Sequence, residues 1–323
     1  MLIGLGGVRG RGDMGPDELV RISHVARRHY LEGRTKIEIA EELGLSRFKI
    51  ARMLEDALEQ GLVKITIEAP DSLDLDLSMQ LRARFGLTRA LAVITPGTTP
   101  ELIQDRLGRA AADLLSEIVT DGDVLGLTAG RTLTAMAGHL RTLATCEVVQ
   151  LAGVAAPTPE NGVEVIRQVS RISGGRSRAI FAPLLVETAA TASALRREPG
   201  IMETFRRFDS VTKAVVAVGS WSPPDSQLYD NAGRAGALDE LLAAGVKAEI
   251  CATLIDENGA VVGSVAERSL AVSTEQLRHI PEVIAVAGGP SKTGAVIAAL
   301  RSGIVDSLVT DAALARRLLE SPV

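Results

Sequence analysis

The chain has 323 residues, a formal net charge of −5, 46% hydrophobic residues and 2% aromatic residues. This length allows two domains, and the charge excludes a protein that binds nucleic acid through a uniformly basic surface. The two cysteines, Cys146 and Cys251, form no CxxC motif, which argues against a disulfide framework and a zinc site, and we predict no cofactor. No apolar run is long enough to span a membrane, so we expect a cytoplasmic protein.

The segment 1–14 contains several glycines and lacks the apolar core of a signal peptide. We expect it to be a flexible leader, and Met14 is an alternative start of the protein. The first domain then begins at about residue 15.

Residues 15–68 have the pattern of a helix-turn-helix domain. A predicted helix over 17–31 precedes the stretch TKIEIAEELGLSRFKIARMLEDALEQGLVK, which begins at Thr35. Gly44 ends one short helix, because glycine tolerates the left-handed conformation, and Ser46 is placed to cap the next. That next helix repeats apolar residues at helical spacing. Such a pair presents its second helix to the major groove of DNA.

The N-terminal turn of this second helix is basic, whereas its other end carries Glu55, Asp56 and Glu59. Arginine and lysine bind guanine edges or phosphates, and an apolar side chain can contact a thymine methyl group. An ordinary α-hairpin with a solvated basic turn is the alternative. The predicted DNA-binding residues are Thr35, Ser46, Arg47, Phe48, Lys49 and Arg52.

Residues 63–67 alternate like a strand, which predicts either a short wing or the start of a linker. A proline and turn-forming residues at 69–72 mark the boundary to a second domain, 69–323. There, strands and helices alternate, and small β-branched residues dominate several strands, as in parallel sheets buried on both faces. We predict a doubly wound, mostly parallel α/β fold. The predicted strands are 89–94, 123–127, 147–151, 178–181, 214–218, 283–287 and 307–309, and the helices include 101–119, 133–143, 163–173 and 312–319.

Two loops of this domain each follow a strand and precede a helix, at the edge where open α/β sheets bind ligands. The first, GLTAGRT, contains Thr128, Gly130, Arg131 and Thr132 and would present backbone amides at a helix N-terminus to a phosphate. The second, VAGGPSKT, places Lys292 in a first helical turn, where a cation opposes the helix dipole, so we expect an anionic partner for it. For the first loop, the alternative is that its glycines serve only the turn. For the second loop, the alternative is that Lys292 is a solvated surface lysine.

No catalytic constellation is apparent in the sequence. The histidines neighbour no plausible nucleophile, and the acidic stretch 256–259 predicts a hairpin turn rather than a general-base pair. The four histidines are His24, His29, His139 and His279.

Several motifs in a fixed order resemble the SorC family of bacterial transcriptional regulators, over about 19–319. They are IAEELGLSRFKIARMLEDALEQGLVKI, GLTAGRT, VVQLAG, VAVGSW, AEICATLIDENG, VIAVAGGPSKTGAVIAAL and SLVTD. The resemblance implies an effector domain similar to sugar-phosphate isomerases and deaminases, used as a sensor, with a phosphate site at 128–132. It further implies effector contacts by Asn161, Glu249, Gly288, Gly289 and Lys292.

Some members of that family carry a basic residue two positions after Gln150, where this chain has Ala152. This departure from the family pattern argues against a bisphosphate effector and against a covalent imine with a lysine at this position, and it favours a monophosphate sugar or a phosphorylated polyol.

We expect a DNA-binding repressor of carbohydrate metabolism genes. It would bind an inverted-repeat, double-stranded operator as a homodimer or homotetramer, and a phosphorylated sugar or polyol would modulate that binding. One alternative is a sugar-phosphate isomerase or deaminase-like enzyme fused to a DNA-binding domain, although the sequence offers no acid–base pair for it. Another is an architectural DNA-binding protein, which the two phosphate-like loops disfavour.

Overall fold

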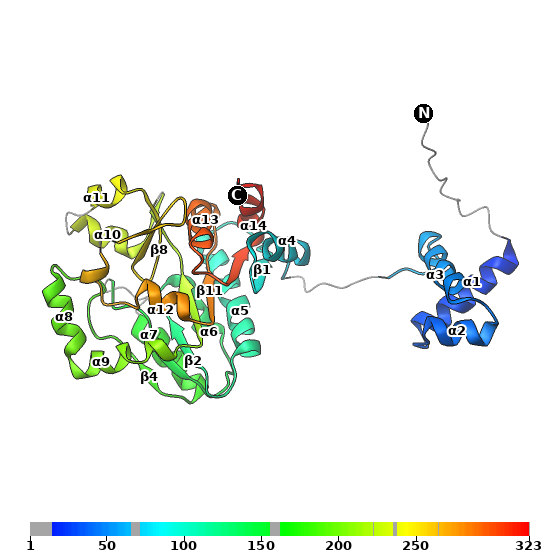
Figure 1. The fold of residues 1–323 in the computed structure, drawn as a ribbon, viewed down its shortest axis with the longest axis horizontal. Coiled ribbons are helices and arrows are strands. Elements are labelled where there is room, and N and C mark those ends of the chain that lie inside the picture. The colour runs from blue at the N-terminus through cyan, green and yellow to red at the C-terminus, as the bar shows by residue number, and fades with distance from the viewer. Residues whose placement is uncertain are drawn as a thin grey trace. The chain divides into compact units, whose positions relative to one another are not determined.

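The computed structural model describes residues 15–65, 72–155, 162–221, 223–234, 238–263 and 265–322 (Figure 1). The chain divides into two compact units, Met1–Glu68 and Ala69–Val323. Three predictions fall outside the described residues: the leader 1–14, most of the boundary at 69–72, and the effector contact of Asn161.

The first unit consists of the helices α1 (Pro16–Tyr30), α2 (Lys36–Leu43) and α3 (Arg47–Glu59). Thr35 caps α2 in a capping box with Glu38, and Gly44 follows α2 with φ of 63°, as its αL role requires. Apolar side chains from all three helices form one small core. Its buried members are Ile22, Val25, Ala26, Ile39, Ala40, Ile50, Met53, Leu54 and Ala57.

Of the two interpretations of 63–67, the short wing is wrong for the described part, because residues 63–65 have no strand geometry. The amide of Val63 instead donates to the carbonyl of Ala57 at 2.9 Å, which folds the segment back against α3. Val63 packs against the core of the first unit.

The second unit is built on a seven-stranded sheet in which every strand pair is parallel. The strand order is β1-β12-β11-β5-β2-β3-β4. The strands are β1 (Arg89–Val93), β2 (Val124–Leu127), β3 (Glu147–Gln150), β4 (Ser177–Arg178), β5 (Lys213–Ala217), β11 (Glu282–Val286) and β12 (Ser307–Asp311). The predicted doubly wound parallel fold is confirmed.

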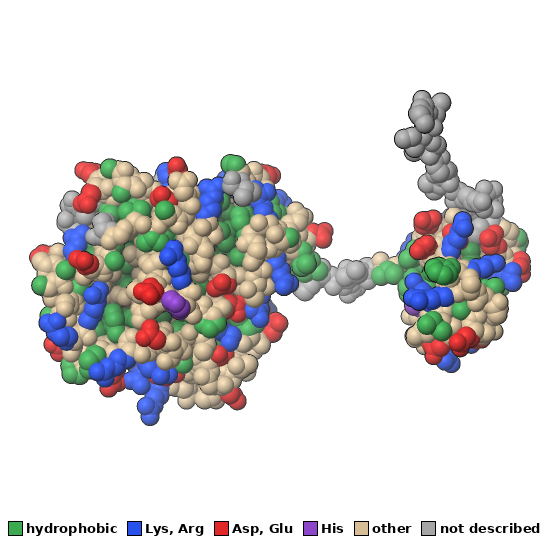
Figure 2. Space-filling view, in the orientation of Figure 1, with side chains coloured by type: hydrophobic (Ala, Val, Ile, Leu, Met, Phe, Trp, Pro, Cys, Tyr) green, Lys and Arg blue, Asp and Glu red, His purple; other side chains and the backbone are tan. Residues whose placement is uncertain are grey.

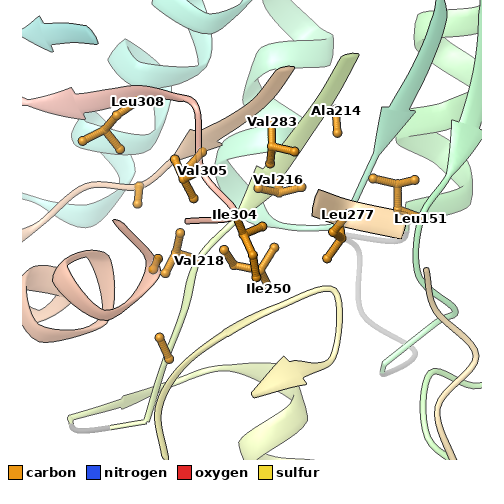
Figure 3. Packing of buried hydrophobic residues seen from close by; sticks show 14 of the residues in the cluster. Leu151, Ala214, Val216, Val218, Ile250, Leu277, Val283, Ile304, Val305 and Leu308 are labelled. Carbon is orange, nitrogen blue, oxygen red and sulfur yellow. The ribbon is translucent and has the colours of Figure 1, made fainter. Parts of the chain in front are cut away.

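Helices cover both faces of this sheet. Leu107 of α5, Met136 of α6 and Val169 of α7 belong to the core on one face. Helices α4, α12, α13 and α14 contribute to the core on the other face, and Figure 3 shows Val216 and Val283 of the strands and Leu277 of α12 in this cluster. The helices are α4 (Leu75–Phe85), α5 (Pro100–Ile118), α6 (Arg131–His139), α7 (Gly162–Ser173), α8 (Ala189–Arg197), α9 (Pro199–Phe205), α12 (Thr274–His279), α13 (Thr293–Arg301) and α14 (Ala312–Glu320).

The strand expected at 178–181 is shorter than predicted, since β4 ends at Arg178. The buried Gln150 explains this end. Its Oε1 accepts the amide of Ile180 at 2.9 Å, so a side chain takes the bond that a strand ladder would use.

A second, five-stranded sheet was not predicted. Its order is β10-β9-β8-β6-β7, and its strand pairs are antiparallel. Only the hairpin turn at 256–259 was expected, and it does join β9 to β10. The elements are β6 (Gly219–Trp221), β7 (Pro224–Asp225), β8 (Val246–Ile250), β9 (Thr253–Asp256) and β10 (Val261–Val262), with α10 (Gln227–Arg234) and α11 (Leu238–Ala243) beside them.

Three short 3₁₀ helices complete the described elements. They are η1 (Phe208–Ser210), η2 (Ala266–Arg268) and η3 (Pro290–Lys292). None of the described helices combines the length and apolarity needed to cross a lipid bilayer.

Candidate functional site

The predicted DNA-contacting side chains lie on the exposed side of α3. Arg47, Lys49 and Arg52 are exposed, and no ion pair among the described residues involves them. Phe48 is 86% exposed, whereas Ile50 on the opposite side of the helix is fully buried. Exposed, unpaired cations beside an exposed ring are free to contact a duplex without disturbing the core of the unit.

Two of the predicted DNA-binding residues also have structural roles. The hydroxyl of Thr35 accepts the amide of Glu38, and the hydroxyl of Ser46 accepts the amide of Lys49, each at 3.2 Å. These bonds fix the start of α2 and α3, and therefore the direction of the basic turn. On the visible face of this unit, basic, acidic and hydrophobic side chains are mixed (Figure 2).

The expected effector residues gather where the strand order of the large sheet reverses. Along the chain, strands β2, β3 and β4 extend the sheet in one direction, and β5, β11 and β12 extend it in the other. Only β5 separates β2 from β11, so the loops after β2 and β11 emerge at the same sheet edge about two strand spacings apart. Such a reversal is where doubly wound sheets bind ligands.

The loop after β2 forms an open helix N-terminus. Thr128 is buried, and its hydroxyl accepts the amide of Ala217 at 3.1 Å, which joins the ends of β2 and β5. Gly130 precedes α6 with φ of 151°, and no side chain caps this helix. Arg131 and the half-buried Thr132 stand in its first turn, so the amides there remain available to an anion.

The two glycines after β11 occupy their positions for different physical reasons. A Cβ on Gly288 would lie 2.4 Å from Cδ1 of Leu107, so a larger residue there would require the buried Leu107 side chain to shift. Gly289 has φ of 94°, and its amide donates to Oδ2 of the buried Asp311 at 2.7 Å. Asp311 also caps α14, so this loop is tied firmly to the sheet.

An aspartate joins the two loops. Nη2 of Arg131 lies 2.7 Å from Oδ1 of Asp225, and Nζ of Lys292 lies 3.0 Å from Oδ2 of the same carboxylate. Lys292 is 12% exposed, and its ammonium also donates to the carbonyls of Val218 and Asp225, each at 2.9 Å. Burial lowers the pKa of Lys292, and the charge of Asp225 opposes that effect. The anionic partner expected for Lys292 is thus supplied by the chain itself.

Glu249 lies beside this cluster on β8. Burial raises the pKa of its carboxyl to about 7, and Ser226, Trp221 and the charge of Lys292 offset that effect only in part. The indole N–H of Trp221 lies close enough to the carboxyl to lower its pKa. Among the described residues, however, neither Nε1 of Trp221 nor Oε2 of Glu249 has a hydrogen-bond partner of good geometry, although both atoms are buried. Two enclosed polar atoms without partners indicate a place for a bound hydroxyl or water.

Glu249→Gln should reduce the pH dependence of stability. The unfolded carboxyl has an ordinary pKa of 4.5, so between about pH 4.5 and 7 the unfolded chain releases a proton that the folded chain keeps, and stability falls as pH rises. The loss is on the order of 2–3 kcal/mol by pH 8. Denaturant unfolding at pH 5 and pH 8 should show a smaller loss for Glu249→Gln than for the wild type. The exposed Glu267→Gln serves as control, and equal losses in all three proteins would contradict the prediction.

The structure brings most of the expected effector residues to one sheet edge and adds others. Arg131 and Lys292 meet through Asp225, and Glu249 lies close to Lys292. Asp225 was missed, because a lone aspartate after a proline has no sequence signal. The structure also makes Trp221 a neighbour of Glu249.

The comparisons with known proteins extend over almost all of the chain. The family model "Putative sugar-binding domain" matches residues 70–320. The chain is 29% identical to the "Uncharacterized transcriptional regulator YjhU" of Escherichia coli K12 over 92% of this chain and 94% of that protein. It is 26% identical to the "Sorbitol operon regulator" of Klebsiella pneumoniae over 94% and 99%. The crystal structure of full-length SorC from that organism superposes with a TM-score of 0.71, at 25% identity, over 94% of this chain and 99% of that one.

Proposed function

The chain belongs to the SorC family of transcriptional regulators, and we propose that it regulates carbohydrate metabolism genes by binding an operator in response to a phosphorylated sugar or polyol. The observation that carries the effector half of this proposal is the cluster at the sheet edge. Arg131 and Lys292 supply two cations for a phosphate. Glu249 and Trp221 supply an acceptor and a donor for a hydroxyl of the same ligand.

The DNA half of the proposal rests on α3. One helix-turn-helix reads few base pairs, so two or more copies of the chain would bind together, and two-fold symmetry would require an inverted-repeat operator. The effector would then change the operator affinity through the arrangement of the copies. Such coupling is reciprocal, so operator DNA would change the effector affinity by the same factor. We further propose a repressor that acts in the cytoplasm.

The test begins with selection of operator DNA from a genomic library by the purified chain. Operator affinity is then measured with phosphorylated sugars and polyols and with their unphosphorylated counterparts. We expect at least one phosphorylated compound to change the affinity about 10-fold, within the usual range of allosteric coupling, and its unphosphorylated form to have little effect. A panel in which no phosphorylated compound changes operator binding would refute the proposal.

An enzyme of the sugar-phosphate isomerase or deaminase type is the second candidate. One observation favours it: a carboxyl with a pKa of about 7, as Glu249 has, suits general acid–base catalysis. Turnover of sugar phosphates by the purified chain, lost in Glu249→Gln, would support this candidate. We propose a regulator without enzyme activity, because the relatives named above are regulators.

A further inference from the structure

We propose that Asp225 is an internal anion that occupies the phosphate position of the effector site and leaves it when the effector binds. This inference rests on the proposed function, because it concerns the same site. It makes the β6–β7 hairpin, with its described strands Gly219–Trp221 and Pro224–Asp225, the element that moves on effector binding.

The carboxylate of Asp225 has the geometry of a bound phosphate. Oδ1 of Asp225 lies 2.7 Å from Nη2 of Arg131, and Oδ2 lies 3.0 Å from Nζ of Lys292. These two cations come from the two loops that open toward the same sheet edge, after β2 and after β11. A phosphate would use two of its oxygens in the same way. The carboxylate and a phosphate therefore compete for the same donors.

Asp225 can move at low cost. It ends β7, a two-residue strand at the edge of the five-stranded sheet, and within the part of the chain that the structure describes β7 pairs with β6 alone. Its side chain is 37% exposed, so water can solvate the carboxylate once it leaves the cations. An edge strand of this kind belongs to the less stable parts of a fold, and its movement would break one further bond, from the ammonium of Lys292 to the carbonyl of Asp225 at 2.9 Å.

Lys292 cannot move as easily. Its side chain is 12% exposed, and its ammonium also donates to the carbonyl of Val218, just after the adjoining strand β5. A buried ammonium is costly without a nearby anion. Asp225 supplies that anion, and an effector phosphate would have to replace it as the partner of the ammonium. The exchange keeps the ammonium paired throughout.

The exchange has a structural consequence at the hydroxyl end of the site. In the hairpin, Asp225 pairs with Ser220 and Pro224 pairs with Trp221, while Gly219 of β6 pairs with Glu249 of β8. A Cβ on Gly219 would lie 2.4 Å from Cγ of Glu249, so hairpin and carboxyl are in close contact. Movement of Asp225 would therefore change the surroundings of both Trp221 and Glu249.

The decisive experiment measures anion binding by Asp225→Asn. Asparagine keeps the shape of the side chain and removes the charge that competes with phosphate. Calorimetric titration of the full Asp225→Asn chain with inorganic phosphate should give a dissociation constant about 10-fold lower than for the wild type. A 10-fold difference is expected if Asp225 occupies the phosphate position in about nine of ten wild-type molecules, because only the remaining molecules can bind phosphate. Asp230→Asn, an exposed position on α10, removes the same charge and should match the wild type.

Two outcomes would overturn the inference. One is a phosphate affinity of Asp225→Asn equal to or weaker than that of the wild type. The other is a loss of affinity for phosphorylated sugars with no change for inorganic phosphate, since Asp225 would then contact the sugar directly. A supporting result is a change in the emission of Trp221, the only tryptophan, when phosphate is added to the wild type and a smaller change in Asp225→Asn.

Different experimental results would contradict the role of Asp225 as an internal anion and the proposed function. If a phosphorylated sugar changes operator binding but Asp225→Asn has wild-type phosphate affinity, the internal anion is wrong and the regulator stands. If Asp225→Asn binds phosphate more tightly but no phosphorylated compound changes operator binding, the internal anion stands and the proposed effector response is wrong.

Discussion

Replacing Arg47 or Arg52 by alanine is expected to weaken operator binding about 10- to 100-fold while effector binding remains unchanged. Both side chains are exposed on α3 and have no ion-pair partner among the described residues, so truncation removes nothing from the core of the first unit. A good contact between an arginine and a guanine edge contributes about 1–3 kcal/mol of discrimination. Fluorescence anisotropy with labelled operator DNA at a fixed salt concentration measures the loss.

The matched control for this prediction is Arg171→Ala on α7 of the second unit. It removes the same charge from another exposed site. Its operator affinity should equal that of the wild type. Wild-type affinity in both Arg47→Ala and Arg52→Ala would show that the N-terminal turn of α3 does not face the DNA.

Lys292→Met is expected to abolish the effector response and to leave operator binding intact. Its ammonium donates to two backbone carbonyls and pairs with Asp225, and methionine keeps the length of the side chain without the charge. A charge-assisted hydrogen bond contributes about 1.5–3 kcal/mol, so the loss of one such bond should lower effector affinity about 10- to 100-fold. The variant should also lose about 1–3 kcal/mol of stability, because Val218 and Asp225 lose a buried partner.

Two further variants separate these effects. Arg131→Gln removes a side chain that is 51% exposed, so effector affinity should fall while thermal unfolding stays near that of the wild type. Lys247→Met makes the same substitution on β8, at a lysine without an ion pair among the described side chains, and should respond to effector normally. A full effector response in Lys292→Met would remove this lysine from the site.

Much of the fold followed from local patterns in the sequence. The helix-turn-helix was predicted from Gly44, which must adopt αL, from Ser46, which caps, and from the apolar spacing of α3. The large sheet was predicted because runs of small β-branched residues alternate with helical periods. These signals lie within short segments, and neighbouring parts of the chain reinforce rather than reverse them.

The second sheet could not be predicted in the same way. Its strands have two to five residues, too few for a clear alternation, and β7 contains a proline. Cys251 and Ala252 join β8 to β9 with φ of 51° and 64°, a conformation that glycine usually takes, so this turn has no sequence signal. Tertiary packing determines these elements, because side chains of the second sheet belong to one core cluster with α10 and α11 and to another with α13.

The sequence by itself determined the two loops with phosphate-binding character, the basic turn of α3 and the candidate cations Arg131 and Lys292. Only the tertiary structure decided what those cations contact. Asp225 reaches them because an edge hairpin of one sheet lies across the ends of two strands of the other. Such a contact joins residues far apart in the chain, and its energy depends on distance and burial, neither of which is encoded in local spacing.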